Sequence, residues 1–314
     1  MQYDYSNCLE LNNLFLVWSN LVRLSGRNLR FTRLDKILKL LSYEYLSQDK
    51  KIFSLANKFE PSLCCSRNKT SFFRIAWNDI GKKGLNVIRK IFALYEGELS
   101  LSAEAIERVL CKFSRLSPYL TFGMDRDAPR LKIYAQLESS KENNTTSGDI
   151  LECLLELAGL FRINIDKRSV KIISGKNIVL MGVDFYPKKK YAIKVYYDLC
   201  RDRWLRELRS FIPDPGFSKE LIKGATGCIF AYTFSMRPQD KKDVKKTLYL
   251  RFKRYSSDLD LCRIPKFLNY KDSGALKKFI RANTVLSVPK VSFLAFGKDK
   301  FTVYAHPGLL PALK

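Results

Sequence analysis

The stretch Gly182–Leu199 reads GVDFYPKKKYAIKVYYDL, and its second half alternates regularly between two kinds of side chain. Such alternation is typical of a β-strand, because successive side chains point to opposite faces. One face carries Ile193, Val195, Tyr197 and Leu199. The other face carries Lys194 and Tyr196. A face that only contacts water would not be expected to carry a large aromatic side chain. A related pattern occurs earlier, in GMDRDAPRLKIYAQLE (Gly123–Glu138).

Strands and helices alternate in a repeated order along the chain. Helical spacing of apolar residues predicts helices over 11–24, 34–46, 84–99, 102–116, 149–161, 202–211, 217–225 and 274–283. Alternation predicts strands over 70–77, within 119–138, and over 169–175, 178–186, 191–199, 226–236, 246–255, 291–297 and 300–307. Short turns between several of these strands make them antiparallel.

This order of two helices followed by two strands predicts one α+β domain over residues 1–314, with residues 1–57 mainly helical. About ten antiparallel strands whose connecting helices return to one side favour a closed β-barrel surrounded by helices. The apolar strand faces would then contact the helices, and the second faces would point into the barrel.

The side chains on those inner faces share a chemistry. Nearly every strand contributes a cation, a tyrosine or both: Arg74, Lys132, Tyr134, Lys194, Tyr196, Tyr249, Arg251, Lys253 and Tyr304. The formal net charge of +25 also indicates an anionic partner. An allylic diphosphate suits such an interior, since cations stabilise the leaving group and tyrosine faces attract a carbocation. The chain has no acidic DDxxD-type metal motif, so we expect lysine and arginine to hold the diphosphate.

Other features of the sequence exclude several classes of protein. Eight cysteines without a CxxC pair and a single histidine argue against a zinc site or a disulfide framework. No segment reaches the length of apolar residues that a membrane span needs, and the polar start is unlike a secretory signal. We therefore expect a cytoplasmic protein without a membrane partner, and a monomer. Magnesium is expected to accompany the diphosphate without a dedicated protein cage.

In the order and spacing of these segments the sequence resembles the ABBA-fold aromatic prenyltransferases, and among them the cyanobactin peptide prenyltransferases. The segments that carry the resemblance are GVDFY, IKVYYDL, LKIYAQLE, TLYLRFK and FTVYAHP, from about residue 58 to the end. The high basic charge departs from the family. The resemblance implies a transfer of a prenyl group from an allylic diphosphate to a side chain of a ribosomal, macrocyclic peptide.

The resemblance also implies a role for each site residue. Glu60 becomes the carboxylate that takes the proton of the acceptor, and the tyrosines become a shield for the carbocation: Tyr134, Tyr196, Tyr249 and Tyr304. The expected diphosphate ligands are Arg74, Lys132, Lys194, Arg251 and Lys253. Ala231 and Phe230 are placed at the prenyl pocket. Family members that use the five-carbon donor look to carry a bulky aromatic at the place of Ala231, so we expect geranyl diphosphate to be preferred over dimethylallyl diphosphate.

Two alternatives stay open from the residues. A prenyltransferase for a small aromatic metabolite would need the same donor site. A basic nucleic-acid-binding protein would explain charge and interleaved aromatics. Against this second alternative, the cations are not clustered in one helix or tail, so we expect no nucleic-acid partner.

Overall fold

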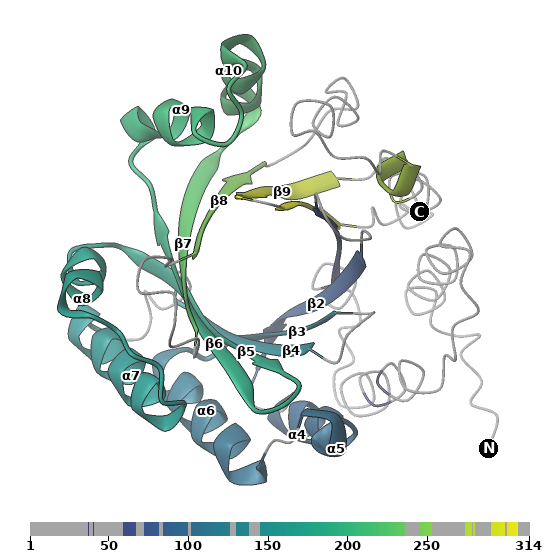
Figure 1. Cartoon of the computed structure of the whole chain (residues 1–314). Helices are drawn as coiled ribbons and strands as arrows, with labels where there is room; N and C mark the ends of the chain where they lie inside the picture. Colours follow the sequence, from purple (N-terminus) through teal and green to yellow (C-terminus); the bar gives the residue numbers. More distant parts are fainter. Residues whose placement is uncertain are drawn as a thin grey trace, which may run out of the picture.

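The structure is a computed structural model that describes residues 59–66, 72–81, 84–99, 102–125, 130–137, 145–235, 245–252, 274–277, 290–298 and 300–306, with residues 37, 40 and 279. Ten strands form a closed barrel in which every strand pairs with its two neighbours in an antiparallel sense (Figure 1). Neighbours in the chain are neighbours in the barrel, and β1 closes it against β10. The predicted fold is therefore confirmed.

The strands pair as five hairpins. Their bounds are β1 Phe59–Ser66, β2 Phe72–Ile80, β3 Leu120–Asp125, β4 Arg130–Gln136, β5 Ile178–Tyr186, β6 Lys190–Asp198, β7 Gly227–Ser235, β8 Lys245–Arg251, β9 Lys290–Gly297 and β10 Lys300–His306. Closure leaves no free edge, so every strand has two hydrogen-bonding neighbours.

Helices connect the hairpins and cover the outside of the barrel (Figure 1). They are α4 Leu85–Ala93, α5 Glu96–Leu99, α6 Ala103–Leu116, α7 Ser147–Leu160, α8 Lys167–Ser174, α9 Arg201–Arg209 and α10 Pro215–Gly224. The predicted helices in residues 1–57 lie outside the described residues, except that Ile37 and Leu40 are helical. None of the helices in the described part of the chain is long and apolar enough to cross a membrane.

One predicted strand is wrong. Residues 169–174 belong to α8, and Gly175 is its C-cap. The helix begins after Asp166, whose side chain accepts a hydrogen bond from the Ser169 amide at 2.6 Å. This capping residue satisfies an amide that the helix itself leaves unpaired. Val170 and Ile173 are three positions apart, which fits a helix as well as the short apolar run fits a strand.

The alternation that opened the sequence separates two apolar clusters. Ile193, Val195, Tyr197 and Leu199 belong to the large cluster that the strands share with the helices. Tyr196 belongs to a smaller cluster, together with Tyr134, Val179, Ile229 and Ala231. Successive residues of β6 thus serve different clusters, and the face with Tyr196 points into the barrel.

Candidate active site inside the barrel

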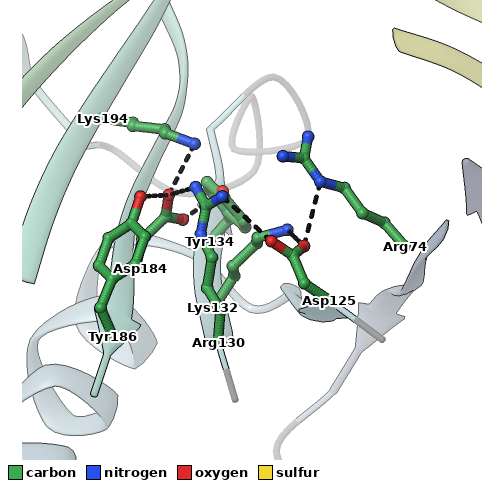
Figure 2. Close-up of polar contacts among 8 residues, drawn as sticks. All are labelled: Arg74, Asp125, Arg130, Lys132, Tyr134, Asp184, Tyr186 and Lys194. Carbon is green, nitrogen blue, oxygen red and sulfur yellow. Dashed lines mark hydrogen bonds and ion pairs between the residues drawn. The ribbon is translucent and has the colours of Figure 1, made fainter. Parts of the chain in front are cut away.

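Four cations on three strands meet inside the barrel, and we call them the cation cluster: Arg74 of β2, Arg130 and Lys132 of β4, and Lys194 of β6 (Figure 2). Each is no more than 9% exposed. Two buried aspartates, Asp125 of β3 and Asp184 of β5, lie among them. The strand register brings these residues together, since Arg74 pairs with Asp125 across β2 and β3, and Lys132 with Asp184 across β4 and β5.

Asp125 holds one side of the cation cluster. Its carboxylate lies 3.0 Å from Arg74 Nε and accepts a hydrogen bond from Arg130 at 3.1 Å. Lys132 also donates to it. Burial raises the pKa of Asp125, but the charges of Arg74, Lys132 and Arg130 outweigh burial and hold it below the ordinary value.

Asp184 holds the other side and is fully buried, at 0% exposure. It accepts a hydrogen bond from the Tyr134 hydroxyl at 2.7 Å, and Lys194 Nζ lies 2.7 Å from its other oxygen. Arg130 donates to the same carboxylate and also lies over the ring of Tyr186, 4.5 Å from its centroid. Burial again raises the pKa of Asp184, but the charges of Arg130, Lys194 and Lys132 together outweigh burial and hold this pKa well below the ordinary value. Asp184 is therefore ionised at neutral pH.

Burial also acts on the lysines of the cation cluster. It lowers the pKa of Lys194 to about 8, against the opposing effect of Asp184. It lowers the pKa of Lys132 as well, although Asp125 again opposes it. The two arginines keep their charge, because the guanidinium group does not lose its proton in proteins. The cluster is consequently a buried, positively charged site, and among the described residues two carboxylates, Asp125 and Asp184, form ion pairs with it.

A row of four tyrosine rings runs beside the cation cluster. The ring centroids are 5.9 Å apart for Tyr134 and Tyr196, 5.4 Å for Tyr196 and Tyr249, and 6.1 Å for Tyr249 and Tyr304. These are distances at which aromatic rings attract one another. Burial raises the pKa of all four hydroxyls above the ordinary value, so they stay neutral. The four tyrosines expected from the sequence therefore form one continuous row, which we call the tyrosine row.

Gly182 makes room for the first ring of the tyrosine row. A Cβ atom at this position would lie 1.9 Å from Cδ1 of Tyr134, far inside the contact distance of two carbon atoms. Gly182 is the register partner of Tyr134 on β4 and of Lys194 on β6. The glycine of GVDFY thus lets the ring of Tyr134 lie flat against the strand.

Glu60 lies near Tyr304, at the end of the tyrosine row opposite Tyr134, where it is 8% exposed and affects the pKa of Tyr304. Ser292 Oγ donates a hydrogen bond of 2.7 Å to Glu60 Oε2. The register of β9 and β10 shifts between Tyr304 and Ala305, a bulge that turns two successive β9 residues toward the interior. One of them, Phe293, packs against the inner cluster, and the other is Ser292.

Some expected site residues lie elsewhere. Arg251 pairs with Gly227 across β7 and β8, and its guanidinium carbon lies 5.6 Å from the ring centroid of Phe293. Arg251 comes two positions beyond Tyr249 on β8 and lies beside Phe293, so we expect it to contribute less to diphosphate binding than Arg74 does. Lys253 lies outside the described residues.

The two residues expected at the prenyl pocket are separated as well. Ala231 belongs to the inner cluster and is 1% exposed. Phe230 belongs to the outer cluster, where it stacks on Tyr197 with the centroids 5.9 Å apart. Phe230 therefore does not face the interior, since neighbouring residues of a strand point to opposite faces.

Sequence reasoning missed both aspartates and one arginine of the site. The signal was present, because Gly-x-Asp occurs in both quoted stretches, as Gly123–Asp125 and Gly182–Asp184. Arg130 lies two positions before Lys132 and so shares its face. The two aspartates could not be recognised as buried from the sequence, because acidic residues near a turn are usually solvated.

A bound magnesium ion does not fit the protein groups of this site. Among the described residues there is no group of three histidine, cysteine, aspartate or glutamate side chains that could hold a metal. Asp125 and Asp184 already form ion pairs with the arginine and lysine side chains of the cation cluster. A divalent ion would have to rely on oxygens that it shares with a ligand.

No protein-family model matches this sequence, and no curated protein sequence matches it. Solved structures do match over nearly the whole chain. The prenyltransferase PriB, in a complex with its product diphosphate, has a TM-score of 0.67 at 14% identity, with 96% of each chain covered. The 5-dimethylallyl tryptophan synthase from Streptomyces coelicolor, with DMASPP and Trp, has a TM-score of 0.65 at 13% identity, covering 97% of this chain and 98% of that one.

A third solved structure matches as well. AnaPT from Neosartorya fischeri has a TM-score of 0.57 at 15% identity, with 95% of this chain and 94% of that chain covered. At such low identities the likeness concerns the path of the chain and not its residues. The chain has the ten-stranded barrel fold of these prenyltransferases.

Proposed function

We propose that this protein transfers a prenyl group from an allylic diphosphate to an aromatic acceptor and releases diphosphate. The observation that supports the proposal most directly is the position of the cation cluster immediately beside the tyrosine row. The Tyr134 hydroxyl and Lys194 bind the same carboxylate, Asp184, so the two groups are in contact through it. A ligand with a negatively charged head matches the cation cluster, and an apolar tail that forms a carbocation matches the tyrosine row.

The cation cluster would stabilise the leaving group. When the bond between carbon and oxygen breaks, negative charge develops on the diphosphate, and fixed cations in a buried site stabilise it without reorganisation. Arg130 Nε is buried and has no hydrogen-bond partner among the described residues, which leaves a donor for a phosphate oxygen. Arginine donors suit phosphate because of their planar, forked geometry.

The tyrosine row would protect the allylic cation. Aromatic faces attract cations through their quadrupole, and a closed row of rings keeps water from capturing the cation. Neutral hydroxyls are required here, because a phenolate would itself be a nucleophile. The raised pKa values of Tyr196 and Tyr249 meet that requirement.

Glu60 would act on the acceptor. It lies near Tyr304, at the end of the tyrosine row opposite Tyr134, so an acceptor beside it would meet the allylic cation at the tyrosine row. As the new bond forms, the acceptor loses a proton, and a carboxylate within hydrogen-bond distance can take it. The Ser292 hydroxyl fixes the orientation of this carboxylate.

An aromatic small molecule is the favoured acceptor class. Solved structures of the same fold include one of PriB with L-tryptophan and dimethylallyl thiolodiphosphate and one of a 6-dimethylallyltryptophan synthase from Micromonospora olivasterospora with DMASPP and Trp. A peptide side chain is the second candidate, supported by the resemblance of GVDFY and IKVYYDL to cyanobactin enzymes. A nucleic acid fits less well, because Tyr134 and Tyr196 are buried inside the barrel and offer no face for a base to stack on.

The proposal is tested by incubating the protein with dimethylallyl, geranyl or farnesyl diphosphate and three acceptors, namely tryptophan, a phenolic metabolite and a mixed cyclic-peptide panel. Mass spectrometry then locates any added prenyl mass. Transfer to tryptophan or the phenol supports the favoured class, and transfer only to peptides supports the second. Absence of transfer from all three donors, together with absence of diphosphate binding, would refute the function. Parallel reactions with EDTA show whether magnesium assists.

A further inference from the structure

Lys300 is a further cation on the inner face of the barrel. It begins β10, where Phe301 and Val303 belong to the outer cluster, so Lys300, Thr302 and Tyr304 share the opposite face. Its side chain folds over Gly297 of β9, since a Cβ atom added at Gly297 would lie 3.1 Å from Lys300 Cγ and 3.4 Å from its Cε. The glycine thereby permits the lysine to bend along the interior.

The charged groups that act on Lys300 are the cations of the site. Arg74 on β2, Lys194 on β6 and Arg130 on β4 all repel its positive charge, and the thiol of Cys64 on β1 acts in the opposite sense with a smaller effect. Asp125 and Asp184 form their ion pairs with the cation cluster. In the part of the chain that the structure describes, no carboxylate forms an ion pair with Lys300.

This environment destabilises the charged form of Lys300. Burial first, and then the three neighbouring cations, lower the pKa of its ammonium group to about 7. Lys298, in the turn just before it, is exposed instead. The two lysines of one hairpin therefore offer a matched pair, one inside and one outside.

We propose that Lys300 is an additional diphosphate ligand that is only partly protonated in the empty protein at neutral pH and takes up a proton when an allylic diphosphate enters. The inference rests on the proposed function. An arriving anion supplies the counter-charge that Asp125 and Asp184 give to the other cations but not to Lys300. When Lys300 loses its proton, the affinity of the site for free diphosphate falls. Product release is therefore favoured at higher pH.

The sign of the pH dependence follows from linkage. Below about pH 7 Lys300 is already charged, and binding needs no proton from it. Above about pH 7 each bound diphosphate brings a proton to Lys300, so affinity falls by up to about tenfold per pH unit until the lysine of the complex itself titrates.

The experiment is calorimetric titration of inorganic diphosphate into the whole protein and into Lys300→Arg, Lys300→Met and Lys298→Met, between pH 6 and 9. Buffers with different ionisation enthalpies give the number of protons taken up. Titration of the diphosphate itself is common to all four proteins. Circular dichroism and urea unfolding establish that each variant is folded.

We expect the unmodified protein to bind like Lys300→Arg at pH 6 and to approach Lys300→Met by pH 9. At pH 8 it should take up close to one proton more than Lys300→Met, while Lys298→Met behaves like the unmodified protein. Equal proton uptake in the unmodified protein and Lys300→Met, or unchanged affinity in Lys300→Met at pH 6, would overturn the inference and leave the proposed function intact. Failure of the unmodified protein to bind diphosphate at any pH would instead refute the function and the inference together.

Discussion

Asp184→Asn is expected to destabilise the fold more than any exchange of a surface carboxylate. Asp184 is fully buried and is bound to Arg130, to Lys194 at 2.7 Å and to the Tyr134 hydroxyl at 2.7 Å. The asparagine amide keeps the shape and one acceptor oxygen, but it removes the charge that balances two buried cations. Removing one partner of a buried ion pair costs about 3–5 kcal/mol, because the remaining charge stays in the interior uncompensated.

A matched control is Glu107→Gln. Glu107 binds Arg89 through both carboxylate oxygens, at 2.5 Å and 2.9 Å, but its side chain is 48% exposed. An exposed pair contributes only about 0.2–1 kcal/mol. The two variants make the same chemical change in two arginine-bound carboxylates and differ mainly in burial.

The assay is urea unfolding followed by circular dichroism, at several pH values. Since the pKa of Asp184 in the folded protein lies below that of an unfolded aspartate, its stabilisation is complete above about pH 4 and disappears as the pH falls further. The difference between the unmodified protein and Asp184→Asn should therefore be largest near pH 5 and shrink in acid. It should also decrease toward pH 8, because Asp184 supports the charged form of Lys194, whose pKa is about 8, and without Asp184 this lysine loses its proton at lower pH. A loss of less than 1 kcal/mol at pH 7, or a loss equal to that of Glu107→Gln, would refute the reasoning.

Three further predictions concern activity. Arg74→Ala should lower the rate of prenyl transfer by about 100- to 1,000-fold with the fold retained, whereas Arg251→Ala should lower it far less; steady-state kinetics with similar losses in both would contradict the assigned diphosphate site. Glu60→Gln should bind diphosphate normally but lose most transfer, because an amide takes no proton at neutral pH; normal turnover at saturation would disprove its role as a base. Ala231→Phe should shift preference from geranyl to dimethylallyl diphosphate, and competition between the two donors measures it; a geranyl preference equal to that of the unmodified protein would contradict the placement of the tail.

Much of the fold could be predicted because it depends on local periodicity. The alternation in β6 and the repeated hairpins indicated a closed barrel, and its inner face could be identified from Lys194 and Tyr196 alone. The exception, residues 169–175, is short enough that a helix and a strand place the same apolar residues at acceptable positions. There the capping aspartate Asp166, and not the apolar pattern, determines the structure.

The site could be predicted only in part, for a different reason. A face assignment finds which residues point inward, but the level of each residue along the barrel depends on the register and on bulges. Arg251 and Tyr249 share a face of β8, yet Arg251 lies two residues farther along the strand, where it pairs with Gly227 and Phe293. Ser292 reaches Glu60 only through the bulge in β9, which no pattern in the sequence indicates.

The spacing of cation and tyrosine on single strands has a consequence for the donor. Lys132 and Tyr134 on β4 are two residues apart, as are Lys194 and Tyr196 on β6. Two residues of a strand span about 6.5–7 Å, so each strand sets an ammonium group and a ring at a fixed offset along the barrel. An allylic diphosphate has its first carbon next to the bridging oxygen, and that offset would place the phosphates against the ammonium groups and the first carbons of the tail against the rings. Because the offset is built into the backbone of a closed barrel, the carbon that develops positive charge would stay at the level of the tyrosine row for donors of any length. Only the far end of the tail would then contact side chains such as Ala231. One substitution there is therefore expected to change the preferred donor length, while the cation cluster and the tyrosine row would bind donors of every length in the same way.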